Sequence, residues 1–353
     1  MNDDLRRKIT LDHIAQQAGV SKFTVSKALS GQSGISLDTR DRVMRIATQL
    51  GYFLQQQAPS SATARSKRVG TLKSVLICMP NVRTQTLESH YWGRIVDGIT
   101  DELVALGIST VILTEHASVS AVHAINMEHM LGIIGVGYVS TNLLISLKNH
   151  DVPLVLIDHE DPAVSCDLLY VDNFTNSVQL VQHLIGLGHR SIAFVGDVAF
   201  SPSFAERYRG YCTALQKNGI DLPDVSDVFR VSGEVNDDTI AFFTITLDQL
   251  QKNGTLPTAF MCANDELAIA MMNALQTKGL RVAQDVSVVG FDDIDEAADA
   301  IPSLTTVHVP KKTLGKRAVH ALLARVKEPS LPYERILLSG NLVFRHSSDT
   351  LHS

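Results

Sequence analysis

The sequence predicts a small all-α domain followed by a larger α/β body of doubly wound parallel sheets. Residues 9–53 hold three short apolar stripes with helical spacing. From residue 74 onward, short apolar runs alternate with longer amphipathic segments, which is typical of parallel strands joined by helices. Charge divides the chain at the same place. Residues 1–73 carry 12 Lys and Arg against 5 Asp and Glu, a net +7, whereas residues 74–353 carry 19 against 32, a net −13.

The first two stripes predict a pair of short helices joined by a tight turn. The first stripe recurs at i, i+3, i+4 and i+7 and consists of Leu11, Ile14, Ala15 and Ala18. Gly19 then supplies the permissive backbone that a tight turn requires. Ser21 is a favourable N-cap for a second helix, in which Val25, Ala28 and Leu29 share one face. This arrangement predicts a helix-turn-helix pair.

A third stripe predicts the helix that closes the core of this small domain. Ser36 can cap it, and Gly51 can end it. Its apolar residues again recur at i, i+3, i+4 and i+7 and are Val43, Ile46, Ala47 and Leu50.

The polar face of the second helix indicates contact with DNA. Two cations, a hydroxyl and an aromatic ring share this face, where Lys can donate to guanine and a ring can meet a thymine methyl group. The hydroxyls near the helix starts suit phosphates. We therefore predict DNA contacts by Ser21, Lys22, Phe23, Thr24, Ser26, Lys27 and Ser36. The alternative is a three-helix module whose polar face is merely solvated.

These segments resemble the headpiece of the LacI/GalR family of bacterial transcriptional regulators. The resemblance rests on residues 10–15 (TLDHIA), 18–21 (AGVS), 24–27 (TVSK) and 43–52. It implies a DNA-reading headpiece at residues 1–58, a hinge at 59–73 and a periplasmic-binding-protein-like body at 74–353 that binds an effector and dimerises.

The hinge departs from the family pattern. In the family, a short hinge helix inserts a leucine into the minor groove. Here Ser61 or Lys67 stands at the leucine position, depending on the alignment, so no leucine wedge is evident. A hinge helix at about residues 60–67 and a flexible tether both stay open.

The body contains two series of strand candidates separated by helical segments. The first series is 75–79, 110–113, 132–139 and 154–157, and the second is 192–195, 228–231, 259–262 and 286–291. The helical segments are 92–106, 176–187, 203–218, 237–251 and 265–278. Further family-like segments include 155–158 (VLID), 262–268 (CANDELA) and 285–293 (DVSVVGFDD). The resemblance implies an N-subdomain of residues 74–171 and 307–330 and a C-subdomain of residues 172–306 and 331–353.

Polar residues that follow the apolar runs predict a ligand cleft, because ligands of doubly wound sheets bind beyond the carboxyl ends of the strands. Asp158, Asn264 and Asp292 follow such runs, and Arg207 lies near the start of a helix. Carboxylates, an amide and a guanidinium suit a ligand with many hydroxyl groups. The resemblance implies effector contacts by Tyr91, Trp92, Ile95, Asp158, Ser203, Arg207, Asn264 and Asp292. Trp92, the single tryptophan, could instead belong to the core.

Several of these polar residues have structural alternatives. Asp265 can cap its own helix, and Asp292 or Asp293 can anchor a turn. Arg207 can form a structural ion pair. Lys311 stands where the family commonly has an apolar or aromatic residue. It is either a surface lysine or a cation that would admit an acidic ligand.

The sequence carries little that would suit an enzyme or a metal site. It has no Walker A loop, no G-x-S-x-G and no HExxH motif. Its four cysteines form no CxxC pair, and three of them (Cys78, Cys212 and Cys262) lie in apolar patterns typical of a core. The histidines at 116, 123 and 129 do not share one helical face cleanly. We expect no cofactor and no metal.

The start of the chain bears on where the protein acts. Residues 1–8 are charged and lack an apolar run behind them, so we expect no signal peptide and a cytoplasmic protein. The sequence thus predicts a ligand-responsive regulator, a repressor of carbohydrate-metabolism genes, which binds a near-palindromic operator as a homodimer. An activator and a regulator with a non-sugar effector are the alternatives. A plain solute-binding protein would share the body but would need a signal peptide and no headpiece.

Overall fold

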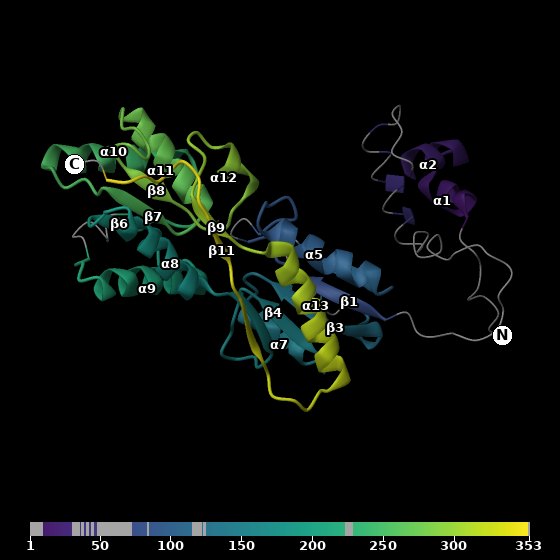
Figure 1. Ribbon diagram of the computed structural model, residues 1–353. Coiled ribbons are helices and arrows are strands. Elements are labelled where there is room, and N and C mark those ends of the chain that lie inside the picture. Colours follow the sequence, from purple (N-terminus) through teal and green to yellow (C-terminus); the bar gives the residue numbers. More distant parts are fainter. Residues whose placement is uncertain are drawn as a thin grey trace, which may run out of the picture. The chain divides into compact units, whose positions relative to one another are not determined.

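A computed structural model describes most of the chain and divides it into two units, Met1–Gly70 and Thr71–Ser353 (Figure 1). The described residues are 10–29, 36, 39, 42–43, 46–47, 73–82, 85–114, 122, 125–222 and 229–351. The predicted hinge therefore lies outside the described residues except for Lys73, and so does the question of a helix at 60–67.

The headpiece contains the predicted helix-turn-helix pair, formed by α1 (Leu11–Ala18) and α2 (Lys22–Leu29). Gly19 takes a left-handed conformation at φ 64° and its N–H donates to the carbonyl of Ala15, which ends α1. The Ser21 hydroxyl accepts a hydrogen bond from the Thr24 N–H at 3.1 Å. The predictions of a turn at Gly19 and a cap at Ser21 are confirmed.

The headpiece core is formed by all three apolar stripes. Its buried side chains are Ile14, Ala15, Ala18, Val25, Ala28, Val43 and Ala47. The described residues of the third segment that are helical are Thr39, Arg42, Val43, Ile46 and Ala47. The Ser36 hydroxyl accepts from the Thr39 N–H at 3.3 Å, which confirms the predicted cap. Local spacing thus positions α2 with its polar face outward.

The N-subdomain of the body is a six-stranded parallel sheet covered by helices. Its strand order is β10-β5-β4-β3-β1-β2, and every neighbouring pair is parallel. The strands are β1 (Ser74–Cys78), β2 (Ser109–Leu113), β3 (Met130–Val136), β4 (Leu154–Ile157), β5 (Asp167–Val171) and β10 (Arg335–Leu338). The helices are α5 (Trp92–Ala105), α7 (Thr141–Lys148), α13 (Lys311–Lys327) and a 3-10 turn at Met127–His129.

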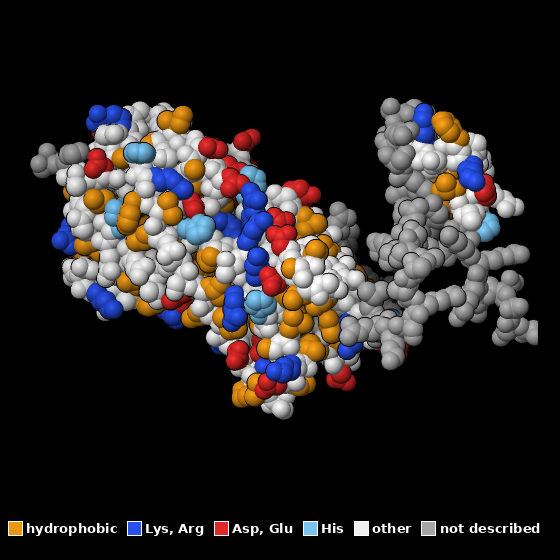
Figure 2. Space-filling view, turned by 45° about the vertical axis from the view of Figure 1, so that its right-hand side comes forward, with side chains coloured by type: hydrophobic (Ala, Val, Ile, Leu, Met, Phe, Trp, Pro, Cys, Tyr) orange, Lys and Arg blue, Asp and Glu red, His pale blue; other side chains and the backbone are white. Residues whose placement is uncertain are grey.

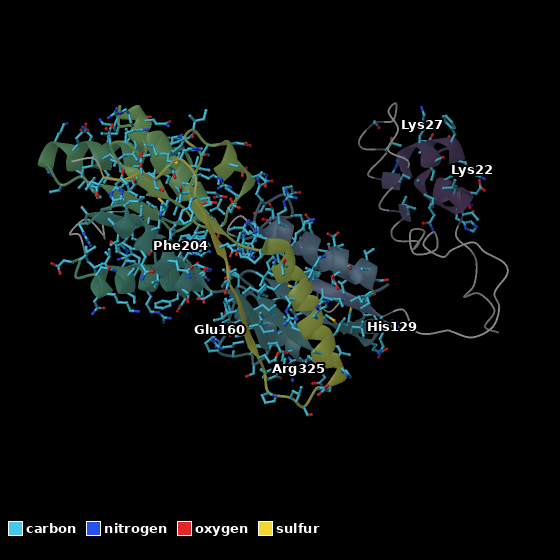
Figure 3. All side chains as sticks on the ribbon, in the orientation of Figure 1. Lys22, Lys27, His129, Glu160, Phe204 and Arg325 are labelled. Atoms are coloured by element: carbon cyan, nitrogen blue, oxygen red, sulfur yellow. The ribbon has the colours of Figure 1, made fainter. Side chains whose placement is uncertain are left out.

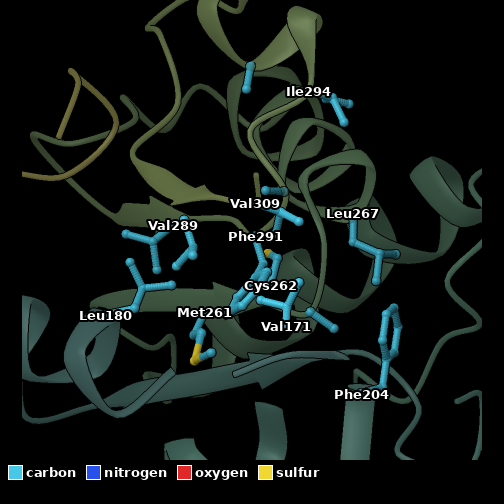
Figure 4. Close-up of a cluster of buried hydrophobic side chains, with 14 of the residues drawn as sticks. Val171, Leu180, Phe204, Met261, Cys262, Leu267, Val289, Phe291, Ile294 and Val309 are labelled. Atoms are coloured by element: carbon cyan, nitrogen blue, oxygen red, sulfur yellow. The ribbon is translucent and has the colours of Figure 1, made fainter. Parts of the chain in front are cut away.

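The C-subdomain has a parallel sheet in the order β6-β7-β8 and a two-stranded antiparallel extension, β9 with β11. The strands are β6 (Ile192–Val195), β7 (Ala259–Cys262), β8 (Ser287–Val289), β9 (Thr306–His308) and β11 (Asn341–Val343). The helices are α8 (Asn173–Gly186), α9 (Pro202–Lys217), α10 (Asp237–Asn253), α11 (Asp265–Thr277) and α12 (Asp295–Asp299). Figure 4 shows part of its core, in which Met261, Phe291 and Leu180 lie together between strands and helices.

Doubly wound parallel sheets in two subdomains are as predicted, but two details are corrected. The segment 331–353 was assigned to the C-subdomain, yet β10 pairs with β5 in the N-subdomain sheet, so the chain crosses back only after residue 338. Residues 229–231, part of a predicted strand, form no strand. Phe229 and Val231 instead accept single hydrogen bonds from Gly196 and Asp197, just beyond the end of β6. The helices α7, α12 and α13 and the strands β5, β9, β10 and β11 were not predicted.

Helices α5 and α13 pack closely along the N-subdomain (Figure 1). Two glycines allow this approach: a Cβ atom on Gly98 would lie 2.1 Å from the Lys312 carbonyl oxygen, and one on Gly315 would lie 2.2 Å from that of Ile95. Exposed ion pairs, such as Lys312 with Asp101 at 3.4 Å, also join the two helices. Figure 2 shows how acidic and basic side chains mix over this surface. Because the backbones touch, the starts of both helices are fixed relative to each other.

Within the described residues, each helix is too short or too polar to cross a lipid bilayer. Of the cysteines, Cys78 and Cys262 are fully buried as predicted, whereas Cys212 is half-buried.

Candidate DNA-binding face and effector cleft

The outer face of α2 presents the predicted polar and aromatic residues. The Phe23 ring is 70% exposed. The Lys27 ammonium lies 5.4 Å from the centre of that ring, and Ser26 is exposed. Figure 3 shows Lys22 and Lys27 at the surface of the headpiece. A cation beside an exposed ring is the combination expected for reading base edges.

Lys22 has a partner in the structure. Its ammonium lies 2.8 Å from the Asp12 carboxylate of α1, and both side chains are more than half exposed. Exposed ion pairs of this kind contribute about 0–1 kcal/mol. A DNA phosphate or base can therefore replace Asp12 at little cost.

The hydroxyls of Ser21 and Ser36 act as helix caps, and Ser21 also bonds the Thr24 hydroxyl at 2.8 Å. Both serines lie at helix starts, a setting that suits phosphates. Phosphate contact by Ser21, Thr24 and Ser36 stays a prediction.

In the body, one cavity of about 110 Å³ lies between the two subdomains. The N-subdomain contributes Gln85, Ser89, His90, Tyr91, Trp92, Tyr138, Asp158 and His159. The C-subdomain contributes residues 200–204, Arg207, Gly233, Asn264, Asp265, Glu266, Asp292 and Ile294. Seven of the eight predicted effector-binding residues therefore line one cavity, although they come from distant parts of the chain.

Arg207 is the centre of the cleft's polar network. Its guanidinium is 3% exposed and donates to the Asn173 side chain at 2.9 Å, the Ala263 carbonyl at 2.5 Å and the Asp292 carboxylate at 3.0 Å. It also stacks 3.8 Å from the centre of the Phe291 ring. The structural ion pair and the position in the cleft are thus both present. The network fixes Arg207, and both Arg207 and Asp292 line the cavity.

Two aspartates enter the cleft on unusual backbone. Asp158 follows β4 at φ 53°, and Asp292 follows β8 at φ 115°, both positive values that favour glycine. Strained positions of this kind concentrate at functional sites. The Ser203 hydroxyl donates to Asp158 at 3.2 Å, which is a hydrogen bond from the C-subdomain to the N-subdomain. Burial raises the pKa of Asp158 and that of Asp292, and Arg207 opposes this shift in both.

Asn264, and not Asp265, is the N-cap of α11. Asn264 caps α11 by accepting from the Leu267 N–H at 2.9 Å, and its amide donates to the Gly233 carbonyl at 3.1 Å. Asp265, considered as the cap, is instead fully buried and accepts from the Ile294 N–H and the Thr306 hydroxyl. Asn264 still lines the cavity and keeps one N–H and one lone pair for a ligand.

The start of α5 forms the rim of the cleft, with one correction. Tyr91 and Trp92 line the cavity and are only partly buried, so Trp92 lies in the cleft rather than in the core. Ile95 was expected to touch the effector, but it is fully buried in the hydrophobic core and does not line the cavity. One helical turn separates Ile95 from Trp92, and the helix axis carries that turn inward against α13.

Lys311 was left open as a surface lysine or a cation for an acidic ligand, and the structure places it in neither setting. Its side chain is buried and donates to the backbone carbonyls of Asp292 and Asp293. Asp293 anchors its turn, as considered, by accepting from the Arg345 guanidinium at 2.7 Å and pairing with His308 at 2.8 Å.

Sequence reasoning missed several lining residues. His159 directly follows Asp158 and bonds the Val139 carbonyl at 2.9 Å, while Gln85 bonds the backbone of Tyr138. Phe200 and Phe204 form an apolar wall. The position of His159 next to a strand-end aspartate was a usable signal, whereas Gln85 lies in a segment with no periodic pattern. In the described part of the chain no three His, Cys, Asp or Glu side chains are placed to hold a metal ion, and His116 and His123 lie outside it.

Asp158→Asn tests the charge of the cleft. Because burial raises the pKa of Asp158, the folded state binds this proton more tightly than the unfolded chain does. Stability from this group is thus full at low pH and lost as pH rises through the folded-state pKa. We expect Asp158→Asn to raise the thermal midpoint of the ligand-free protein at pH 7, since Asn tolerates positive φ. The midpoint gain should shrink at acidic pH. An equal gain at both pH values would contradict the argument.

Comparison with known proteins identifies both units. The sequence pattern of "Bacterial regulatory proteins, lacI family" matches residues 10–54, and that of "Periplasmic binding protein-like domain" matches residues 181–348. Relatives include the HTH-type transcriptional repressor PurR of Haemophilus influenzae, 28% identical over 349 residues that cover 96% of this chain and 98% of the relative. The PurR of Vibrio atlanticus is 28% identical over 350 residues, covering 97% and 99%.

Solved structures agree with these relatives. The complex of the transcriptional regulator CelR with cellobiose has a TM-score of 0.68 at 25% identity and covers 96% of this chain and 99% of that one. The lac repressor dimer bound to operator and the anti-inducer ONPF has a TM-score of 0.66 at 26% identity, covering 98% and 100%. A helix-turn-helix headpiece, a two-subdomain body with a polar cleft and these likenesses lead to one conclusion: the chain joins a lacI-family DNA-binding domain to a periplasmic-binding-protein-like body and is a DNA-binding transcriptional regulator.

Proposed function

We propose that this protein is a repressor that binds a near-palindromic operator as a homodimer and responds to a compact, hydroxyl-rich effector of carbohydrate metabolism. It acts in the cytoplasm. The observation that carries the proposal is the convergence of Asp158, Ser203, Arg207 and Asp292 on one inter-subdomain cavity. Relatives support it: one solved structure holds cellobiose, and another is a dimer on operator DNA.

The chemistry of the cleft favours a neutral ligand over an anion. Arg207 is already neutralised by Asp292, and Lys311 does not line the cavity. Asp158 and Glu266 add further negative charge. A sugar acid or sugar phosphate would therefore meet like charges with no spare cation. Hydroxyl groups can donate to these carboxylates and accept from the Asn264 amide.

The size of the cavity limits the ligand further. Its volume of about 110 Å³ lies below the roughly 300–1,000 Å³ of pockets for drug-sized ligands. The rings of Tyr91, Trp92, Phe200 and Phe204 border the space and can stack on the apolar face of a sugar ring. A monosaccharide or a similarly compact polyol fits this description best.

The effector proposal is tested by the fluorescence of Trp92, the single tryptophan, which lies in the cleft. The full-length protein is titrated with neutral sugars, including ribose and cellobiose, and with matched sugar phosphates. We expect saturable changes in emission with neutral sugars only. A response to the phosphates alone would reverse the charge argument, and silence across the neutral panel would remove carbohydrates as the effector class.

DNA reading is tested by Lys27→Ala. We expect a loss of about 1–3 kcal/mol in operator binding and relaxed specificity at one base position, because Lys donates to base edges in the major groove. Affinities are measured by fluorescence anisotropy on the operator and on single-base variants at fixed salt. Lys316→Ala, an exposed lysine of the body, is the control and should leave operator binding unchanged. An equal loss on every sequence would reduce Lys27 to a phosphate contact.

A further inference from the structure

Lys311 begins α13 of the N-subdomain but is bound to the C-subdomain. Its ammonium donates to the Asp292 carbonyl at 2.5 Å and the Asp293 carbonyl at 3.0 Å. The side chain is only 7% exposed. A buried lysine is costly unless its donors are satisfied, so these bonds are a specific feature of the fold and not a chance surface contact.

The turn that Lys311 holds is the one that forms the cleft. Asp292 and Asp293 have φ values of 115° and 52°, which turn their carbonyls toward the ammonium. The side chain of Asp292 lines the cavity and pairs with Arg207. The carboxylate of Asp292 therefore lies at the effector cavity. The backbone carbonyls of the same turn are bound by Lys311.

On its other side, Lys311 is joined to the N-subdomain wall of the cleft. Its ammonium lies 6.0 Å from the centre of the Tyr91 ring, at the start of α5. The backbones of α5 and α13 touch at Gly98 and Gly315, so these helices move together. A displacement of the Asp292–Asp293 turn would thus be passed through Lys311 to the helix pair that carries Tyr91 and Trp92.

Two ion pairs across the cleft are more exposed than Lys311. His90 with Glu296 at 2.7 Å and Arg94 with Asp295 at 2.8 Å also bridge the subdomains, but all four side chains are roughly half or more exposed. Exposed pairs contribute about 0–1 kcal/mol each and are screened by salt. The ammonium of Lys311 is buried and is therefore screened much less by salt.

We propose that Lys311 is a positioning residue that holds the effector cleft closed by fastening the Asp292–Asp293 turn to the start of α13. The inference deepens the proposed function, since it concerns the same cleft. Closure sets the fraction of the protein that is competent to bind the effector. The apparent dissociation constant of the effector is inversely proportional to that fraction. Loss of the hydrogen bonds from Lys311 to this turn opens the cleft even without an effector.

The test compares full-length Lys311→Met, which keeps the length of the side chain but removes its charge, with Lys311→Arg and Lys312→Met. Lys312 is the matched control because it is exposed and lies next to Lys311 in the first turn of α13. Acrylamide quenching of Trp92 reports access to the cleft. We expect the quenching constant to rise about twofold or more in Lys311→Met, since an opened cleft exposes the ring. It should stay at the wild-type value in Lys312→Met and be partly restored in Lys311→Arg.

A role in stability alone gives a different result. Lys311→Met would then lower the thermal midpoint while Trp92 quenching in the folded protein stayed at the wild-type value, and this outcome would overturn the proposal. Should Lys311→Met not fold, the comparison of Lys311→Arg with the wild type decides, because the larger guanidinium must shift the turn if Lys311 sets its position. The measurement needs no effector, so a wrong effector class leaves it unaffected.

Discussion

Arg207→Ala is expected to destabilise the body by about 3–5 kcal/mol and to abolish the response to effector. The substitution leaves the buried Asp292 carboxylate without its 3.0 Å partner, and breaking a buried pair from one side costs this much. It also frees the Ala263 carbonyl and the Asn173 side chain. Thermal unfolding of the full-length protein should show a midpoint lower by roughly 10 °C.

Arg209→Ala is the matched control for this loss. Arg209 lies on the same helix, but its side chain is 64% exposed, pairs with Glu206 three residues away and lies 5.0 Å from the centre of the Phe174 ring. We expect its midpoint to stay within about 1–2 °C of the wild type. Operator affinity is then measured below the unfolding range with and without effector. A response of wild-type size in Arg207→Ala would remove Arg207 from the effector site and leave only its structural role.

Gly315→Ala is expected to destabilise the body by roughly 2–3 kcal/mol, at the upper end of overpacking effects. The new Cβ would lie 2.2 Å from the Ile95 carbonyl oxygen and 2.8 Å from the Ile99 nitrogen, and backbone atoms cannot rotate away. Helices α5 and α13 would have to separate. Because α5 begins with Tyr91 and Trp92, Trp92 emission should change as well.

Gly186→Ala makes the same chemical change where there is room. Gly186 is the last residue of α8, and a Cβ there meets no atom within 4 Å. Alanine is the better helix former, so a gain of up to about 1 kcal/mol is expected. The two substitutions should therefore act with opposite signs in chemical denaturation. Equal effects would show that helix propensity outweighs the packing of α5 on α13.

The headpiece could be predicted from the sequence in most of its described features. Its helices, the turn at Gly19 and the caps at Ser21 and Ser36 all depend on residues within about four positions of each other. Such contacts follow from helical geometry alone. The polar face of α2 followed as soon as the buried face was assigned.

The cleft could be predicted in part, because strand ends mark it. Asp158, Asn264 and Asp292 each follow a recognisable apolar run, and the rule for parallel sheets brings such ends to one edge of each sheet. The edges of the two sheets contribute to one cavity. The exact role of each side chain did not follow. Asn264 rather than Asp265 caps α11, since both types are good caps and only the buried site of Asp265 decides between them.

The sequence by itself thus determined the helix-turn-helix headpiece, the alternating α/β body and most residues of the cleft. Tertiary structure alone decided the rest. The pairing of β10 with β5 in the N-subdomain sheet could not be predicted, because the two strands lie more than 160 residues apart in the chain. Ile95 turned inward because two glycines let α13 approach α5. The burial of Lys311 could not be predicted, because its partners are backbone carbonyls. Every residue carries such a group, so no side-chain pattern reveals it.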